Sequence, residues 1–188
     1  VEVPGTVVQR VDYGIDEILL IGTNEGLLRY RDGEFHAILE TSDEVTCLSI
    51  NREGTRFAAG LSGGEVHIGD TREGEAVKFL EGSDWTYDLD WHPSGDRIAV
   101  ARSQAPLQVV ETGGSIVMEV GEDLTRFRAV RFDEVRGLAP ICDENEIYEL
   151  FDIDHDTRDF IKKQKALIGA GGIINDIGLA PDGMMLVA

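Results

Sequence analysis

The sequence predicts an all-β fold, a β-propeller of four-stranded antiparallel blades, because it repeats itself every 41 residues. Residues 54–60 are matched 41 positions later by 95–101, and again by 136–142. Each repeat holds short runs of alternating apolar and polar residues, bounded by Gly, Asn, Asp and Ser, which is typical of strands and hairpin turns. A period of about 40–45 residues with this composition is the signature of one blade.

Four strands are expected in each repeat. In the second repeat they are 45–50, 56–60, 65–68 and 76–80, with a turn at 51–55 and a hairpin at 62–64. In the third repeat they are 86–91, 97–101, 107–110 and 115–120, with the equivalent turn at 92–96. In the fourth they are 127–132, 137–142, 146–151 and about 157–161, and a short helix is the alternative for 159–167. In the shorter first repeat, residues 22–26 align with 60–64 at an offset of 38.

The repeats predict a single propeller wedge over 1–188, with blades at about 1–41, 42–82, 83–123 and 124–170 and a partial blade at 171–188. The partial blade holds two expected strands, 173–179 and 184–188. An unfinished blade exposes an apolar face and open strand edges, which soluble proteins avoid. We therefore expect about four and a half blades of a fragment or half-ring that more chain, or a second copy, completes.

A family resemblance rests on the third repeat. Residues 86–99, Thr-Tyr-Asp-Leu-Asp-Trp-His-Pro-Ser-Gly-Asp-Arg-Ile-Ala, resemble the inner strand, turn and second strand of a WD-repeat blade, and 177–183 resemble them again. The acidic residue that ends the third strand recurs in every repeat, as Asp32, Asp70, Glu111 and Asp152. The Trp that usually precedes it is replaced, and the Gly-His dipeptide of that family is missing. The resemblance implies a non-catalytic scaffold for protein–protein interaction.

Two other function classes remain as alternatives. Residues 20–33 of the first repeat are similar to blades in the sensor portions of two-component regulators, which would imply a ligand-sensing part of a signalling protein. A propeller hydrolase or lyase would gather His and carboxylates in its channel, and the expected inner strands contain no His. We therefore expect no enzyme, and a variant WD-like repeat explains the whole period better than the sensor does.

The net charge of the chain limits the classes of partner that it is expected to bind. It has 36 Asp and Glu against 17 Lys and Arg, a formal net charge of −19, and four of the basic residues are Lys. Excess carboxylates with scarce Lys are typical of a salt-adapted cytosol, so we expect a cytoplasmic protein of a halophilic archaeon, and an ordinary acidic protein is the alternative. Nucleic acids and anionic membranes are not expected partners because both bind cationic surfaces.

One acidic segment has the alternating pattern of a calcium loop. Asp152, Asp154 and Asp156 occupy alternate positions, but the sixth and twelfth positions hold Thr157 and Lys163, where such a loop needs Gly and Glu. An acidic hairpin is the simpler interpretation of this segment. We therefore expect no metal and no cofactor, with these three carboxylates as the weak candidate for calcium.

A cationic and aromatic group of residues is the candidate binding site. Arg126 and Arg128 align with Trp85 and Tyr87 of the preceding repeat, and Arg131 follows in the same strand. Inner strands line the channel of a propeller, and Trp, Tyr and Arg dominate binding hot spots. We expect these five residues to contact a protein or peptide partner. The alternative is that the arginines pair with nearby carboxylates, such as Asp90, Asp123 and Asp133.

Overall fold

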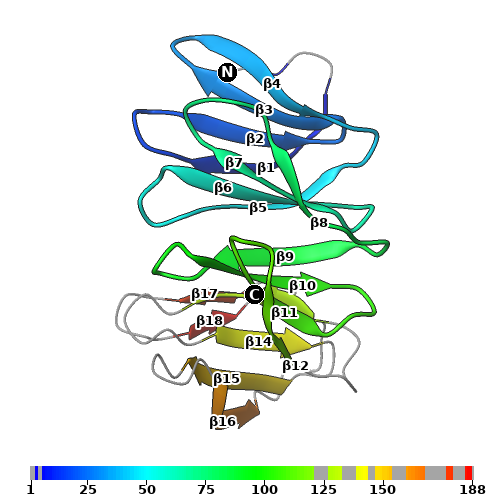
Figure 1. Cartoon of the computed structure of the whole chain (residues 1–188), viewed down its shortest axis with the longest axis vertical. Helices are drawn as coiled ribbons and strands as arrows, with labels where there is room; N and C mark the ends of the chain where they lie inside the picture. The colour runs from blue at the N-terminus through cyan, green and yellow to red at the C-terminus, as the bar shows by residue number, and fades with distance from the viewer. Residues whose placement is uncertain are drawn as a thin grey trace. The chain divides into compact units, whose positions relative to one another are not determined.

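The computed structural model of the chain is built from β-strands (Figure 1). It describes residues 3, 6–120, 127–132, 139–143, 147–153, 160–167, 177–179 and 185–187. These residues form strands and turns and include no helix, as the sequence predicts. No helix that could cross a bilayer is found in this described part of the chain.

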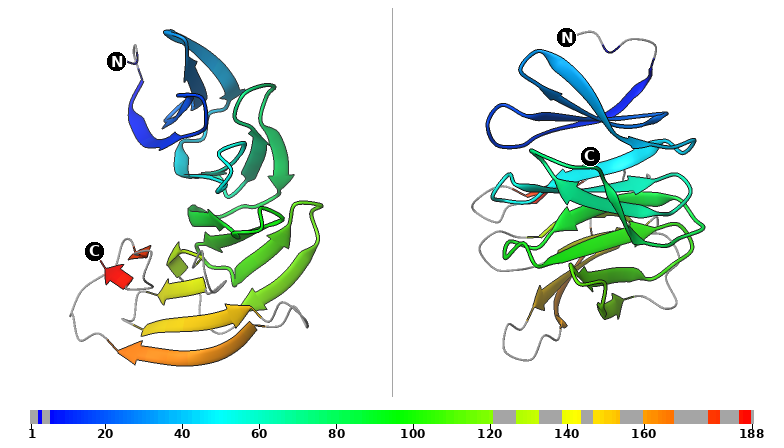
Figure 2. Two further views of the ribbon diagram at one scale, coloured as in Figure 1. Left: turned by 90° about the vertical axis from the view of Figure 1, so that its left-hand side faces the viewer. Right: turned by 45° about the horizontal axis from the view of Figure 1, so that its top comes forward.

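The described residues form four sheets of four strands, and each of these is an antiparallel meander in chain order. The first holds β1 (Val8–Tyr13), β2 (Leu19–Thr23), β3 (Gly26–Arg31) and β4 (Glu34–Glu40). The second holds β5 (Val45–Ile50), β6 (Arg56–Leu61), β7 (Val66–Asp70) and β8 (Val77–Leu80). The third holds β9 (Thr86–Trp91), β10 (Arg97–Arg102), β11 (Leu107–Glu111) and β12 (Ile116–Val120). Figure 2 shows these sheets from two further directions.

The fourth sheet holds β13 (Phe127–Val130), β14 (Ala139–Asp143), β15 (Ile147–Ile153) and β16 (Phe160–Leu167). A separate two-stranded sheet pairs β17 (Ile177–Leu179) with β18 (Met185–Val187). Each four-stranded sheet falls inside one expected repeat, and β5 and β9 have the expected bounds. The prediction of four-stranded antiparallel sheets is therefore confirmed.

The short helix considered for 159–167 is wrong. β16 pairs with β15 from Ile153↔Phe160 to Ile147↔Leu167, so the fourth strand lies later in the chain than the expected 157–161. Pairing along a whole neighbouring strand satisfies the backbone N–H and C=O groups, whereas a helix this short is marginal in water.

The chain divides into two compact units, Val1–Thr86 and Tyr87–Ala188. The first unit holds the first two sheets, and the second unit holds the other strands except Thr86, the first residue of β9. Whether these units form the single wedge expected over 1–188 stays a prediction.

The turn between the first and second strands has the same backbone hydrogen bonds in the second and third repeats. In the second repeat the Asn51 N–H donates to the Arg56 carbonyl and the Gly54 N–H donates to the Asn51 carbonyl. His92 and Gly95 make the equivalent bonds 41 residues later. Gly54 and Gly95 both have a φ of 72°, a conformation that favours glycine. The period read from the sequence thus corresponds to a repeated backbone structure.

Each unit has its own apolar core. In the first unit, Leu20 and Leu27 of the first sheet pack with Val45 and Phe57 of the second, and all four side chains are fully buried. In the second unit the core joins β10 and β11 to β13. Its buried members are Ala99, Ala101, Leu107, Val109, Phe127, Val130 and Phe132. Within each unit, apolar side chains on facing strands therefore hold two consecutive sheets together.

Candidate interaction surface on the first strands

A β-bulge recurs in the first strand of the sheets. The pairing of β1 with β2 skips Gln9, that of β5 with β6 skips Thr46, and that of β13 with β14 skips Arg128. Thr46 and Arg128 are separated by two periods of 41 residues, and Tyr87 of β9 stands midway at the same position. A bulge leaves one residue out of the ladder and re-aims its side chain. We name these residues the bulge column: Gln9, Thr46, Tyr87 and Arg128.

In the first unit, the bulge column joins each sheet to the segment that begins the next. The Gln9 side-chain amide donates to the Glu44 carboxylate at 3.2 Å, immediately before β5. The buried Thr46 hydroxyl lies 2.5 Å from the Thr86 carbonyl and 3.1 Å from the Gly60 carbonyl. Both side chains are polar and uncharged. The acceptor of Gln9 is a carboxylate, and the acceptors of Thr46 are backbone carbonyls.

In the second unit the same column holds an aromatic–cation pair. The guanidinium carbon of Arg128 lies 4.8 Å from the centroid of the Tyr87 ring, within range of a cation–π interaction. Both residues are half-buried. The alignment of Tyr87 with Arg128 in the sequence therefore becomes a contact between neighbouring repeats. Arg126, the third residue expected in this group, lies outside the described residues.

Trp85 belongs to the first unit and directly precedes β9. It is 40% exposed, which is high for the largest apolar side chain. The indole of Trp85 is therefore partly open to solvent, and its contact with a partner stays a prediction.

Aspartates on the first strands tie consecutive sheets together through the backbone. Three residues after the bulge position, Asp12 accepts the Ile50 N–H at 2.9 Å in the first unit. In the second unit Asp90 occupies the same position of its repeat and accepts the Phe132 N–H at 2.8 Å. The carboxylates thus fasten β1 to the end of β5, and β9 to the second residue after β13. The sequence analysis missed this link, because the two aspartates share a position only when they are counted from the bulge, which the strand pairing shows.

Arg131 takes the corresponding position in the fourth repeat, and its role differs. A guanidinium has no acceptor, so Arg131 cannot receive a backbone N–H as Asp12 and Asp90 do. It instead pairs with Asp88 of β9 and donates to the Val130 carbonyl at 2.6 Å. Asp88 also accepts the Val130 N–H at 2.9 Å. Arg131 therefore pairs with a neighbouring carboxylate, although Asp88 is none of the three expected; of those, Asp123 and Asp133 lie outside the described residues.

The environment of Asp88 changes its acidity. Its side chain is 13% exposed, and burial raises the pKa of the carboxyl to about 6. Arg131 and the Val130 N–H act in the opposite direction because both favour the ionised form, while the nearby Asp90 raises the pKa further. Asp88 is thus a buried acid that titrates close to neutral pH.

A His, Ser and Asp lie together in the turn after β9, but their order is not that of a hydrolase. His92 Nδ1 lies 2.5 Å from the Ser94 hydroxyl and accepts the Ser94 N–H at 3.1 Å. The Ser94 hydroxyl in turn hydrogen-bonds to Asp96. A catalytic triad places the imidazole between the hydroxyl and the carboxylate, whereas here the hydroxyl lies between the other two. This group closes the turn expected at 92–96.

The described residues contain no cluster of His, Cys, Asp and Glu side chains that could hold a metal ion. Asp152 lies in β15, whereas Asp154 and Asp156 lie outside the described residues, so the calcium candidate stays a weak prediction.

No protein-family model matches the chain, and no curated protein sequence is similar to it.

Proposed function

We propose that the four-stranded sheets are blades of a WD-repeat-like β-propeller, and that the chain is a non-catalytic scaffold that binds a protein or peptide at the first strands. The observation that carries this proposal is the Tyr87–Arg128 contact in the bulge column, at 4.8 Å. Tyr and Arg are enriched at binding hot spots, where a large rigid side chain lies beside a multidentate donor. Exposed Trp85 would supply a further contact.

The contrast between repeated structural contacts and a variable bulge column supports a binding role. The turns and the carboxylate-to-amide links repeat between sheets, whereas the bulge column varies from Gln and Thr to Tyr and Arg. Variation at one position of a constant frame is what a platform needs to recognise a particular partner. The partner would present acidic or aromatic groups, which complement the Arg128 guanidinium and the Tyr87 ring.

Recovery of partners from an extract of the source cell tests the site. Wild type, the double variant Tyr87→Ala/Arg128→Gln and the single variant Trp85→Ala would each serve as bait. Gln9→Ala is the matched control because it changes the same column in the first sheet. We expect a partner that wild type and Gln9→Ala recover, that the double variant loses and that Trp85→Ala recovers less well. Equal recovery of every partner by the double variant would remove the site assignment.

A further inference from the structure

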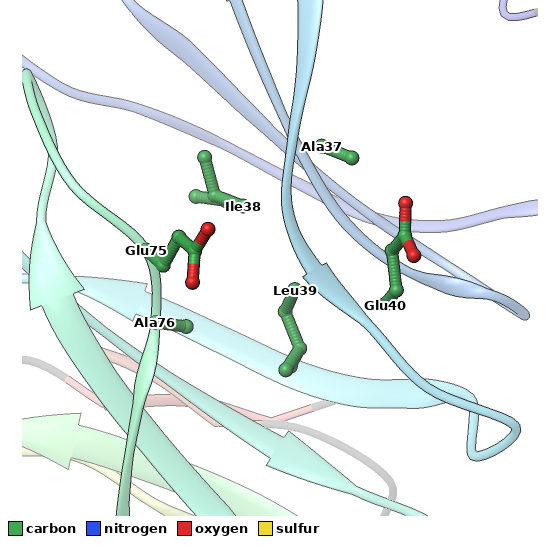
Figure 3. Close-up of a pocket in the computed structure, with 6 residues that line it drawn as sticks. All are labelled: Ala37, Ile38, Leu39, Glu40, Glu75 and Ala76. Carbon is green, nitrogen blue, oxygen red and sulfur yellow. The ribbon is translucent and has the colours of Figure 1, made fainter.

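The outer edge of the first sheet is occupied by the chain's own second repeat. The Ile38 carbonyl of β4 accepts the Ala76 N–H at 2.8 Å, from the connection that precedes β8. Figure 3 shows both residues among those that line the pocket between these two segments. A further strand therefore cannot add along this part of β4, and a partner of the first sheet would have to pack on its face.

One face of the first sheet is apolar across all four strands. Residues that pair directly across neighbouring strands lie on the same face of a sheet. Two successive rows of such pairs are apolar from β1 to β4: Tyr13, Leu19, Tyr30 and Phe35 in one row, and Val11, Ile21, Leu28 and Ala37 in the next. We name the side of the sheet that carries these rows the open face. The opposite side carries Leu20 and Leu27, which pack on the second sheet, so the first sheet is apolar on both sides.

The most exposed part of the open face is β1. Val11 is 51% and Tyr13 71% exposed, although both are apolar or aromatic. The equivalent residues of the third and fourth repeats, counted from the bulge column, are at most 5% exposed: Leu89, Trp91, Val130 and Phe132. In the fourth repeat they belong to the core that joins the fourth sheet to the third. These two positions of a repeat are therefore suited to burial against another sheet, and an exposed apolar patch of this kind marks an interaction surface.

The backbone link that joins consecutive repeats is already made within the first sheet. At the two junctions described above, the N–H groups of Ile50 and Phe132 donate to an aspartate of the preceding repeat. Tyr13 has the same position in its repeat, and its N–H donates at 2.8 Å to Oδ1 of the neighbouring Asp12, whose Oδ2 accepts the Ile50 N–H. The Tyr13 amide therefore needs no acceptor from a partner, and apolar contact alone can bury the open face. A preceding repeat built like the others would leave its own aspartate without this donor.

We propose that the open face binds the open face of a second copy of the chain, which gives a dimer with two-fold symmetry. A two-fold contact needs one self-complementary surface, and two apolar sheet faces that stack on each other meet this condition. Both copies then cover the same exposed positions of β1 that the third and fourth repeats bury. This inference does not rest on the proposed function, whose contacts are Trp85, Tyr87 and Arg128.

The size of the open face and the charge of the chain set the strength of this dimer. Four strands about 4.8 Å apart and about 20 Å long give a face of roughly 400 Å². Each partner of a standard interface contributes about 800 Å², so the dimer should be weak. The net charge of −19 opposes association at low salt, whereas molar salt screens this repulsion. We therefore expect a monomer in dilute buffer and a dimer at high protein concentration in molar potassium chloride.

Sedimentation velocity of the 188-residue chain, over a series of protein concentrations in low and molar potassium chloride, tests this proposal. The double variant Val11→Lys/Tyr13→Lys should raise the dissociation constant of the dimer at least tenfold, because it would bury ammonium groups in the contact. Each Lys also lowers the net negative charge, so general repulsion between copies falls and cannot explain a loss of the dimer.

Val77→Lys/Ile116→Lys is the matched control. It makes the same change of charge at two exposed apolar residues outside the open face, and it should dimerise at least as well as wild type. Wild type that stays monomeric at every concentration and salt, or an open-face variant that dimerises like wild type, would overturn the proposal. An open series of trimers and larger species would overturn the two-fold arrangement, because such a contact closes at the dimer.

Discussion

The junction of β1 with β5 and the junction of β9 with β13 follow one plan and differ in chemistry. Both are fastened by an aspartate three residues after the bulge position, Asp12 in one and Asp90 in the other, that accepts a backbone N–H of the next repeat. The first junction adds a glutamine–glutamate hydrogen bond. The second adds the Asp88–Arg131 ion pair and an aromatic–cation contact. The shared link sets the geometry, and the added groups make the second junction sensitive to charge and pH.

The two units carry a similar net negative charge, so added salt should stabilise both of them. Residues 1–86 hold 17 acidic and 7 basic residues, and residues 87–188 hold 19 and 10, so the net charges are −10 and −9. At about 0.01 M salt the Debye length is roughly 30 Å and repulsion acts across a whole unit, whereas at 1 M it falls to about 3 Å. We expect the melting temperature to rise by about 10 °C or more, since roughly 2 kcal/mol shifts a domain of this size by that amount.

Thermal melts across a potassium chloride series measure this effect. Trp91→Phe leaves Trp85 as the fluorescent reporter of the first unit, and Trp85→Phe leaves Trp91 for the second. A melting temperature that is flat or falls with salt would remove the halophilic assignment. A rise in one unit alone would show that local charges, rather than net charge, control stability.

Removing Asp88 from the second junction should cost more stability than removing Asp12 from the first. Asp88→Ala leaves the Val130 N–H without its acceptor and the Arg131 guanidinium without its carboxylate partner. The Arg131 side chain is 30% exposed. Breaking a partly buried pair of this kind costs about 2–3 kcal/mol of unfolding free energy. Asp12→Ala removes one hydrogen bond at the first junction and should cost about 1 kcal/mol.

Urea denaturation of the two variants and amide hydrogen exchange at Val130 and Ile50 check this ranking. Exchange should accelerate at Val130 in Asp88→Ala and at Ile50 in Asp12→Ala, with little change at the other junction. Equal losses of stability would mean that the contacts of Asp88 contribute no more than the single hydrogen bond of Asp12.

The pH dependence of the second unit follows from Asp88. An unfolded Asp releases its proton near pH 4, whereas Asp88 in the folded chain holds it until a pH of about 6. Between these values the folded state binds more protons, so this group stabilises the fold at low pH and that contribution is lost as pH rises from about 4 to 6. The loss is up to about 3 kcal/mol, at roughly 1.36 kcal/mol per pKa unit.

Asp88→Asn isolates this contribution because the amide oxygen still accepts the Val130 N–H but does not titrate. Urea midpoints of wild type should fall between pH 4 and pH 6 relative to those of Asp88→Asn, and the two curves should run parallel from pH 6.5 to 8. Parallel curves over the whole range would place the pKa of Asp88 near its ordinary value.

The strands and turns could be predicted because they depend on local chemistry that recurs every 41 residues. The turn at 51–55 needs an Asn side chain and a glycine with positive φ, and both are visible in the sequence. The contacts between repeats were harder to predict, because Asp88 and Arg131 are 43 residues apart and their pairing depends on how two sheets pack. The alignment of Tyr87 with Arg128 gave their shared position, whereas the bulge that re-aims the column is visible only in the strand pairing.

The smallest expected effect on stability comes from the residues proposed to bind. Arg128→Gln removes the cation over the Tyr87 ring, a contact worth about 0.5–1 kcal/mol where it is partly exposed. Gln9→Ala in the first junction removes a single side-chain hydrogen bond and should cost about as much. If the bulge column serves binding, Arg128→Gln should lower partner affinity at least tenfold while its urea midpoint stays close to that of Gln9→Ala. A large stability loss in Arg128→Gln, with unchanged affinity, would instead make Arg128 a structural residue that joins the two sheets.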